Sequence, residues 1–128
     1  MVSAAKRILI IDDVEENADI LRVKLRHEGF EVLVAGDGES GLEIARRDRP
    51  DLVLCDIMLP KMDGWEVLRS LRADPSLVAV PVIFMTAYTT IQYSGERRRA
   101  QEEGAVEYVK KPFDLSAMAG LVRKHLGM

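Results

Sequence analysis

Two patterns of apolar residues alternate along the chain: short, largely apolar runs, and longer stretches in which apolar residues recur at helical spacing. The short runs are rich in β-branched residues, which is typical of strands in a parallel sheet that is buried on both faces. We predict five strands from these runs, at residues 7–11, 31–35, 52–55, 80–85 and 105–110.

The segments between these runs carry apolar residues three or four positions apart, which is the spacing of an amphipathic helix. In the first segment Ala18, Leu21 and Leu25 share one face, and Gly29 is a C-terminal stop signal. The other predicted helices are 39–47, 65–72, 96–103 and a last one that carries Leu115, Met118, Val122 and Leu126. Helix 96–103 is mostly polar, so we expect a solvated helix with the run Arg97–Arg99 facing water.

Strand and helix alternate five times with short connections, and this order decides the expected fold class. Such alternation predicts an α/β fold, in which right-handed crossovers build a doubly wound, five-stranded parallel sheet with helices on both faces. We expect residues 1–6 to be a disordered lead-in and residues 7–128 to form a single domain.

Composition and charge narrow the class of protein. Hydrophobic residues make up 48% and charged residues 30% of the 128, which is a globular composition. The net charge of −3 argues against direct nucleic-acid binding by this domain. The lone cysteine, Cys55, excludes an intrachain disulfide and is expected to be a small core residue. No apolar run is long enough to span a bilayer, so we expect a cytoplasmic protein without a membrane partner.

Carboxylate, hydroxyl and ammonium groups follow four of the predicted strands. Asp12 and Asp13 follow the first strand, Asp56 the third, Thr86 the fourth and Lys111 the fifth. Because all carboxyl ends of a parallel sheet lie on one edge, these groups are expected to converge where open α/β sheets bind their ligands.

Three carboxylates in one place repel each other unless a cation joins them, and an oxygen-only cluster of this charge suits Mg²⁺. We predict Asp13 and Asp56 as direct ligands, Asp12 as a ligand through a water molecule, and the backbone carbonyl of Met58 as a further ligand. Asp56 ends the central strand and is the predicted nucleophile, which accepts a phosphoryl group. Lys111 would then supply a positive charge to the phosphoryl oxygens.

The set Asp12-Asp13, Asp56, Thr86-Ala87 and Lys111-Pro112, with the loop Asp56–Gly64, resembles the receiver domain of two-component response regulators over about residues 7–126. The resemblance implies a flavodoxin-like (βα)5 fold. It also implies Mg²⁺-dependent transfer of a phosphoryl group to Asp56 from the phosphohistidine of a sensor histidine kinase or a phosphotransfer protein. Such a domain catalyses only its own phosphorylation and dephosphorylation, and turns over no outside metabolite.

The same resemblance implies a switch. Thr86 is expected to move toward the phosphoryl group and hydrogen-bond it, and Tyr108 to turn inward. The face made by the fourth helix, fifth strand and fifth helix would then change partners, control a downstream effector or output domain, or support a homodimer. A cis peptide bond before Pro112 is expected as well. Thr86 and Lys111 lie further apart in sequence than is usual, by about one helical turn, and we expect the additional residues within 88–95.

Other interpretations stay open. Asp12 and Asp13 alone are good helix caps, and Tyr108 is equally compatible with simple packing. A hydrolase with an aspartyl-phosphate intermediate generally has an acid two residues after its nucleophile, where this chain has Met58. A flavodoxin-like nucleotide binder would cradle phosphate after the first strand, where this chain instead has acidic residues. A receiver that no longer accepts phosphate would be a static docking module.

Overall fold

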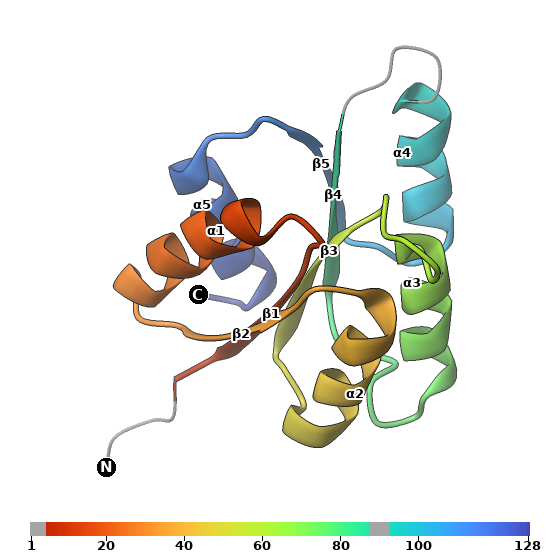
Figure 1. The fold of residues 1–128 in the computed structure, drawn as a ribbon, viewed down its shortest axis with the longest axis horizontal. Helices are drawn as coiled ribbons and strands as arrows, with labels where there is room; N and C mark the ends of the chain where they lie inside the picture. Colours follow the sequence, from red (N-terminus) through yellow and green to blue (C-terminus); the bar gives the residue numbers. More distant parts are fainter. Residues whose placement is uncertain (1–4, 88–92) are drawn as a thin grey trace.

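The computed structural model describes residues 5–87 and 93–128, of which residues 93 and 94 are described by their backbone alone. Strands and helices alternate from β1 to α5, as Figure 1 shows. The strands are β1 (Arg7–Ile11), β2 (Glu31–Ala35), β3 (Leu52–Asp56), β4 (Val82–Ala87) and β5 (Glu107–Lys111). The helices are α1 (Glu15–His27), α2 (Gly38–Asp48), α3 (Gly64–Ala73), α4 (Tyr93–Glu102) and α5 (Leu115–His125).

The five strands form one parallel sheet in the order β2-β1-β3-β4-β5. Helices α1 and α5 cover one face, and α2, α3 and α4 cover the other (Figure 1). The predicted fold class is therefore confirmed, down to the doubly wound arrangement. The order changes direction between β1 and β3, which makes the carboxyl ends of these two strands the expected ligand site.

Two apolar cores lie on the two faces of the sheet. Alternate residues of each strand point to opposite faces, so Leu52 and Leu54 join the core under α1 and α5 while Val53 and Cys55 join the other. Every residue of β3 is buried, which explains why its sequence is a continuous apolar run that ends on Asp56. The prediction that Cys55 is a core residue is confirmed.

The ends of β4 and β5 differ from the prediction. β4 starts at Val82 because Pro81 has no N–H and contributes only its carbonyl, which accepts a hydrogen bond from Val53. It continues through Thr86 and Ala87 because these residues pair with β5. β5 begins two residues later than predicted, since the N–H of Ala105 closes the C-terminus of α4 by bonding to the carbonyl of residue 100.

Two backbone features shape the edge where the strands end. The Lys111–Pro112 peptide bond is cis, as predicted. The loop after β3 turns back on itself, and the N–H of Gly64 donates to the carbonyl of Ile57 over 2.9 Å. A Cβ at Gly64 would lie 2.7 Å from the carbonyl oxygen of Asp56, so only glycine permits this close return. None of the described helices is long and apolar enough to cross a membrane.

Candidate functional site

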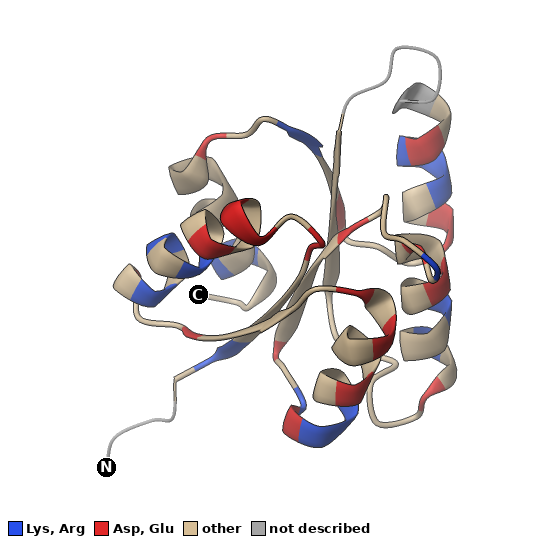
Figure 2. Cartoon of the chain, viewed as in Figure 1, with Lys and Arg blue, Asp and Glu red and all other residues tan. Residues whose placement is uncertain are grey.

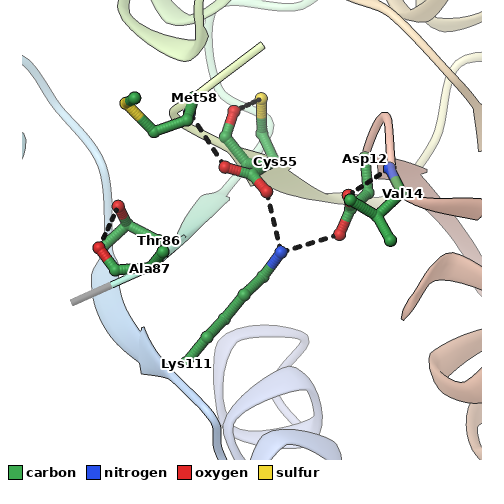
Figure 3. A network of polar contacts seen from close by, with 8 residues as sticks. Asp12, Val14, Cys55, Met58, Thr86, Ala87 and Lys111 are labelled. Carbon is green, nitrogen blue, oxygen red and sulfur yellow. Dashed lines mark hydrogen bonds and ion pairs between the residues drawn. The ribbon is translucent and has the colours of Figure 1, made fainter. Parts of the chain in front are cut away.

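Two buried aspartates lie side by side at the carboxyl ends of β1 and β3. Asp12 is 3% exposed and Asp56 is 5% exposed. In each residue the Oδ1 atom accepts a hydrogen bond from the backbone N–H two residues later, at 2.9 Å from Val14 and at 2.9 Å from Met58 (Figure 3). One oxygen of each carboxylate is thereby held by the chain itself, and the other is directed into the site.

The side chain of Lys111 joins these two free oxygens. Its Nζ atom donates to Asp12 Oδ2 over 2.9 Å and to Asp56 Oδ2 over 2.7 Å, as the dashed lines of Figure 3 show. The lysine side chain is 18% exposed, so its ammonium is partly shielded from water. The structure therefore brings Asp12, Asp56 and Lys111 together, although 99 positions separate the first from the last.

A third carboxylate completes an acidic cluster. Ligand oxygens of Asp12, Asp13 and Asp56 all lie within 4.8 Å of one another, and Asp13 is the exposed member. This cluster is not explained by helix capping, because α1 begins after Val14 without any side-chain cap. Three carboxylates face one ammonium, so the site has an excess of negative charge. Oxygen donors in this arrangement fit a hard divalent cation such as Mg²⁺.

The pKa values of Asp56 and Lys111 are both shifted by burial and by the charges of this cluster. Burial raises the pKa of the Asp56 carboxyl, and the charge of Asp12 adds to this effect, while the hydrogen bonds from Lys111 and from the Met58 N–H oppose it. Burial alone would lower the pKa of Lys111, but its hydrogen bonds to Asp56 and Asp12 outweigh burial and raise the pKa. Lys111 thus keeps its positive charge, and any further positive charge beside Asp56 would favour the ionised form of its carboxyl.

Thr86 lies in the same edge of the sheet but does not join the carboxylates. Its side chain is buried, and its hydroxyl donates to the carbonyl of Ala87 over 3.3 Å (Figure 3). Tyr108 is also buried, and its hydroxyl donates to Glu96 Oε1 of α4 over 2.6 Å. The predicted switch roles of Thr86 and Tyr108 concern a second state of the molecule and stay predictions.

Met58 and Cys55 flank the nucleophile candidate in different ways. Met58 is 68% exposed, and its backbone N–H is the group that contacts Asp56. The thiol of Cys55 points away into the core and donates to the carbonyl of Asp56 over 3.3 Å. Burial raises the pKa of this thiol far above its usual range, which leaves it protonated and unreactive.

A cavity of about 460 Å³ opens beside the acidic cluster, between the starts of α1 and α5. Asp12 and Lys111 form its polar end, and apolar side chains such as Ile20, Phe113 and Leu115 form most of the remaining wall. A mostly apolar cavity therefore borders Asp12 and Lys111 on the α1–α5 side.

Sequence reasoning missed two polar contacts outside this edge. His125 is half-buried, and its Nε2 atom lies 2.7 Å from Glu107 Oε2. The run Arg97–Arg99 is exposed, as predicted, but the guanidinium of Arg99 also lies over the ring of Trp65 at 4.0 Å from its centroid. The spacing of Arg99 and Glu103, four positions apart, is the sequence signal for the ion pair that holds this arginine.

The family model for the response regulator receiver domain matches residues 8–123, which is most of the chain. The chain is a response regulator receiver domain. Its acidic cluster and lysine lie within the matched range. Receiver domains of response regulators are generally signalling switches, and the fold, with its parallel sheet of five strands, is that of the family.

The chain is similar to curated response regulators that are longer than it is. The chain is 43% identical over 108 residues to the response regulator PleD of Caulobacter vibrioides, which covers 84% of this chain and 23% of PleD. It is 42% identical over 126 residues to the DNA-binding response regulator MtrA of Mycolicibacterium smegmatis, which covers 98% of this chain and 53% of MtrA. The chain thus spans about a quarter of the first relative and about half of the second.

Solved structures of receiver domains superpose closely. A CheY-like response regulator receiver domain protein from Methanospirillum hungatei matches with a TM-score of 0.86 and 29% identity, covering 97% of this chain and 95% of that one. The signal receiver domain of a histidine kinase from Syntrophus aciditrophicus matches with a TM-score of 0.86 and 29% identity, covering 96% and 91%. These matches support the receiver fold over nearly the full length.

Proposed function

We propose that this receiver domain accepts a phosphoryl group on Asp56 from the phosphohistidine of a sensor histidine kinase or a phosphotransfer protein. The observation that carries the proposal is the contact of Lys111 Nζ with both Asp56 and Asp12, beside a third carboxylate, at one edge of the sheet. A carboxylate held between a fixed ammonium and a cation site is poised to attack phosphorus rather than to stabilise the fold.

In the proposed step the free oxygen of Asp56 attacks the phosphorus of the phosphohistidine. An O–P bond forms, the N–P bond breaks, and the imidazole leaves with the electron pair of that bond and takes up a proton. Lys111 lies within hydrogen-bond distance of the attacking carboxylate and would neutralise charge on the transferred phosphoryl oxygens. The Met58 N–H holds the other carboxylate oxygen, which keeps the attacking one oriented.

Mg²⁺ is the proposed cofactor, with Asp13 and Asp56 as direct ligands, Asp12 through a water molecule, and the carbonyl of Met58 as a further ligand. The excess negative charge of the cluster and the raised pKa of Asp56 support a divalent cation at this place. When bound, it would supply charge neutralisation to the phosphoryl oxygens. It would also favour the ionised form of Asp56 over the protonated one.

The proposed partners are the phosphoryl donor and a downstream effector or output domain. The apolar cavity between α1 and α5 supports approach of the donor from that side, since it leads directly to Asp12 and Lys111. The face of α4, β5 and α5 is the proposed output face, with Thr86 and Tyr108 as switch residues, and it is also where a homodimer would form. The predicted longer segment within 88–95 falls largely on residues 88–92, which lie outside the described residues.

Treatment with acetyl phosphate and Mg²⁺, followed by intact mass measurement, tests this function. The proposal predicts a mass gain of one phosphoryl group in the wild type and none in Asp56→Asn. Dependence of the gain on Mg²⁺ would be checked in parallel by adding a chelator. An unchanged mass of the wild type under all conditions would contradict the proposal.

A further inference from the structure

Helix α4 is attached to the domain mainly through polar contacts, unlike the other helices. Among the α4 side chains that the structure describes, Ala100 is the only buried one. Helix α3, its neighbour on the same face, buries Trp65, Val67, Leu68 and Leu71. Figure 2 shows charged residues of both signs along α4. The position of α4 therefore depends on specific side-chain contacts more than on burial of apolar surface.

Arg99 makes two of these contacts. Its guanidinium lies over the Trp65 ring at 4.0 Å from the centroid, which is a close cation–π distance. The Nε atom of Arg99 donates to Glu103 Oε2 over 2.6 Å, and Arg69 of α3 donates to Glu103 Oε1 over 3.1 Å. Glu103 thus holds Arg99 in the stacked position and ties it to α3 at the same time.

Trp65 connects this contact to the loop that follows Asp56. The tryptophan is 5% exposed and meets Phe84 of β4 edge to face, with the ring centroids 4.9 Å apart. It directly follows Gly64, whose N–H is bonded to Ile57 and whose backbone lies against the carbonyl of Asp56. A shift of the backbone at Asp56 or in β4 would therefore move the ring on which Arg99 rests.

We propose that the stacked pair of Arg99 and Trp65, held by Glu103, couples the position of α4 to the state of Asp56. This connection runs through the start of α3 and is separate from Thr86 and Tyr108. It rests on the proposed function, because phosphorylation of Asp56 is the event that it transmits. Arg99 is a positioning residue in this scheme, and by linkage the contact acts in both directions between the site and α4.

Hydrogen exchange of the amides in 95–102, measured with and without acetyl phosphate and Mg²⁺, tests the coupling. Arg99→Lys keeps the positive charge but removes the planar group that stacks on Trp65. Arg98→Lys makes the same change at an exposed neighbour on the same helix and is the matched control. Intact mass measurement of each sample reports phosphorylation independently of α4.

We expect phosphorylation to change α4 exchange in the wild type and in Arg98→Lys. The change should be about fivefold smaller in Arg99→Lys, at the lower end of typical coupling between sites. Glu103→Gln, which releases Arg99, should show a similar loss, and all variants should gain the phosphoryl mass. Equal exchange responses in wild type and Arg99→Lys, or an equal loss in Arg98→Lys, would overturn the coupling alone. Absence of phosphoryl mass in the wild type would overturn the proposed function and the coupling with it.

Discussion

Strand β3 has an aspartate at each end, and the two residues have different surroundings. Asp51, just before the strand, is partly exposed, and its Oδ2 atom accepts a hydrogen bond from the backbone N–H of Arg7 over 2.8 Å. Asp56, at the other end, is buried and shares its surroundings with two carboxylates and one ammonium. The carboxylate of Asp51 is thus paired with a backbone N–H, whereas the carboxylate of Asp56 lies in a cluster with excess negative charge. An imbalance of this kind costs stability and points to a functional site.

The largest expected effect is a difference in phosphoryl incorporation between variants of these two aspartates. Asp56→Asn should abolish phosphoryl incorporation from acetyl phosphate, because an amide lacks the negative charge that attacks phosphorus. Asp51→Asn, at the opposite end of the same strand, should incorporate phosphoryl groups at the wild-type rate. Radiolabelled or mass-based incorporation over time measures both. Comparable losses of phosphoryl incorporation in the two variants would contradict the different roles given to Asp51 and Asp56.

Removing the ammonium at the Asp56 end should give the next largest effect. Lys111→Met is expected to slow phosphorylation by about 100-fold, which is the usual cost of losing one charge-stabilising group at a reacting centre. Lys110→Met is the control, since alternate residues of β5 point to opposite faces. Initial rates of incorporation give the comparison, and a rate for Lys111→Met near that of the control would argue against a role for this ammonium.

Mg²⁺ should raise the free energy of unfolding by binding beside Asp56. The substitution Asp51→Asn, at the other end of β3, should leave this gain unchanged. Binding to the folded state at 100 times the dissociation constant contributes about 2.7 kcal/mol to unfolding free energy. Thermal or urea unfolding with and without Mg²⁺ would show this gain in the wild type and in Asp51→Asn. In Asp13→Asn the gain should be much smaller, because one of the three clustered carboxylates is lost. An unchanged gain in that variant would exclude Asp13 as a ligand.

The smallest effect concerns Glu103, which precedes β5 and so lies toward the end of the sheet opposite the site. The hydrogen bond from Arg99 lowers the pKa of its carboxyl below 4.5, and Arg69 adds to this effect. A lowered pKa means that the stabilisation is present above pH 4.5 and is lost as the pH falls through the folded-state value. For a pair this exposed the contribution is below about 1 kcal/mol.

Urea unfolding of wild type and Glu103→Gln at neutral and acidic pH measures this contribution. The two proteins should differ at pH 7 and converge as the pH falls below 4.5. A difference that stays constant with pH would show that the ion pair is not its source.

The fold and the composition of the site could be predicted for the same physical reason. Alternating apolar runs and helical spacing determine a parallel sheet, and a parallel sheet brings the residues after its strands to one edge. Asp12, Asp56 and Lys111 were therefore expected to meet. The sequence did not show that Lys111 bridges both aspartates, because this depends on side-chain rotamers and on the paths of two loops.

The contact between Arg99 and Trp65 could not be predicted, for a different reason. It joins two helices whose relative placement is decided by tertiary packing and not by any local pattern. The end of β4 is a similar case, since Thr86 and Ala87 belong to the strand only through their pairing with β5. Local sequence predicted the elements, and long-range contacts determined how far each element extends.

The most direct test of the central claim is the location of the phosphoryl group within the chain. Borohydride reduction of the acyl phosphate after treatment with acetyl phosphate and Mg²⁺, followed by peptide mass spectrometry, marks the modified aspartate. The account predicts reduction at Asp56 alone. Modification of Asp12, Asp13 or Asp51 with Asp56 unmodified, or no modified aspartate at all, would contradict it.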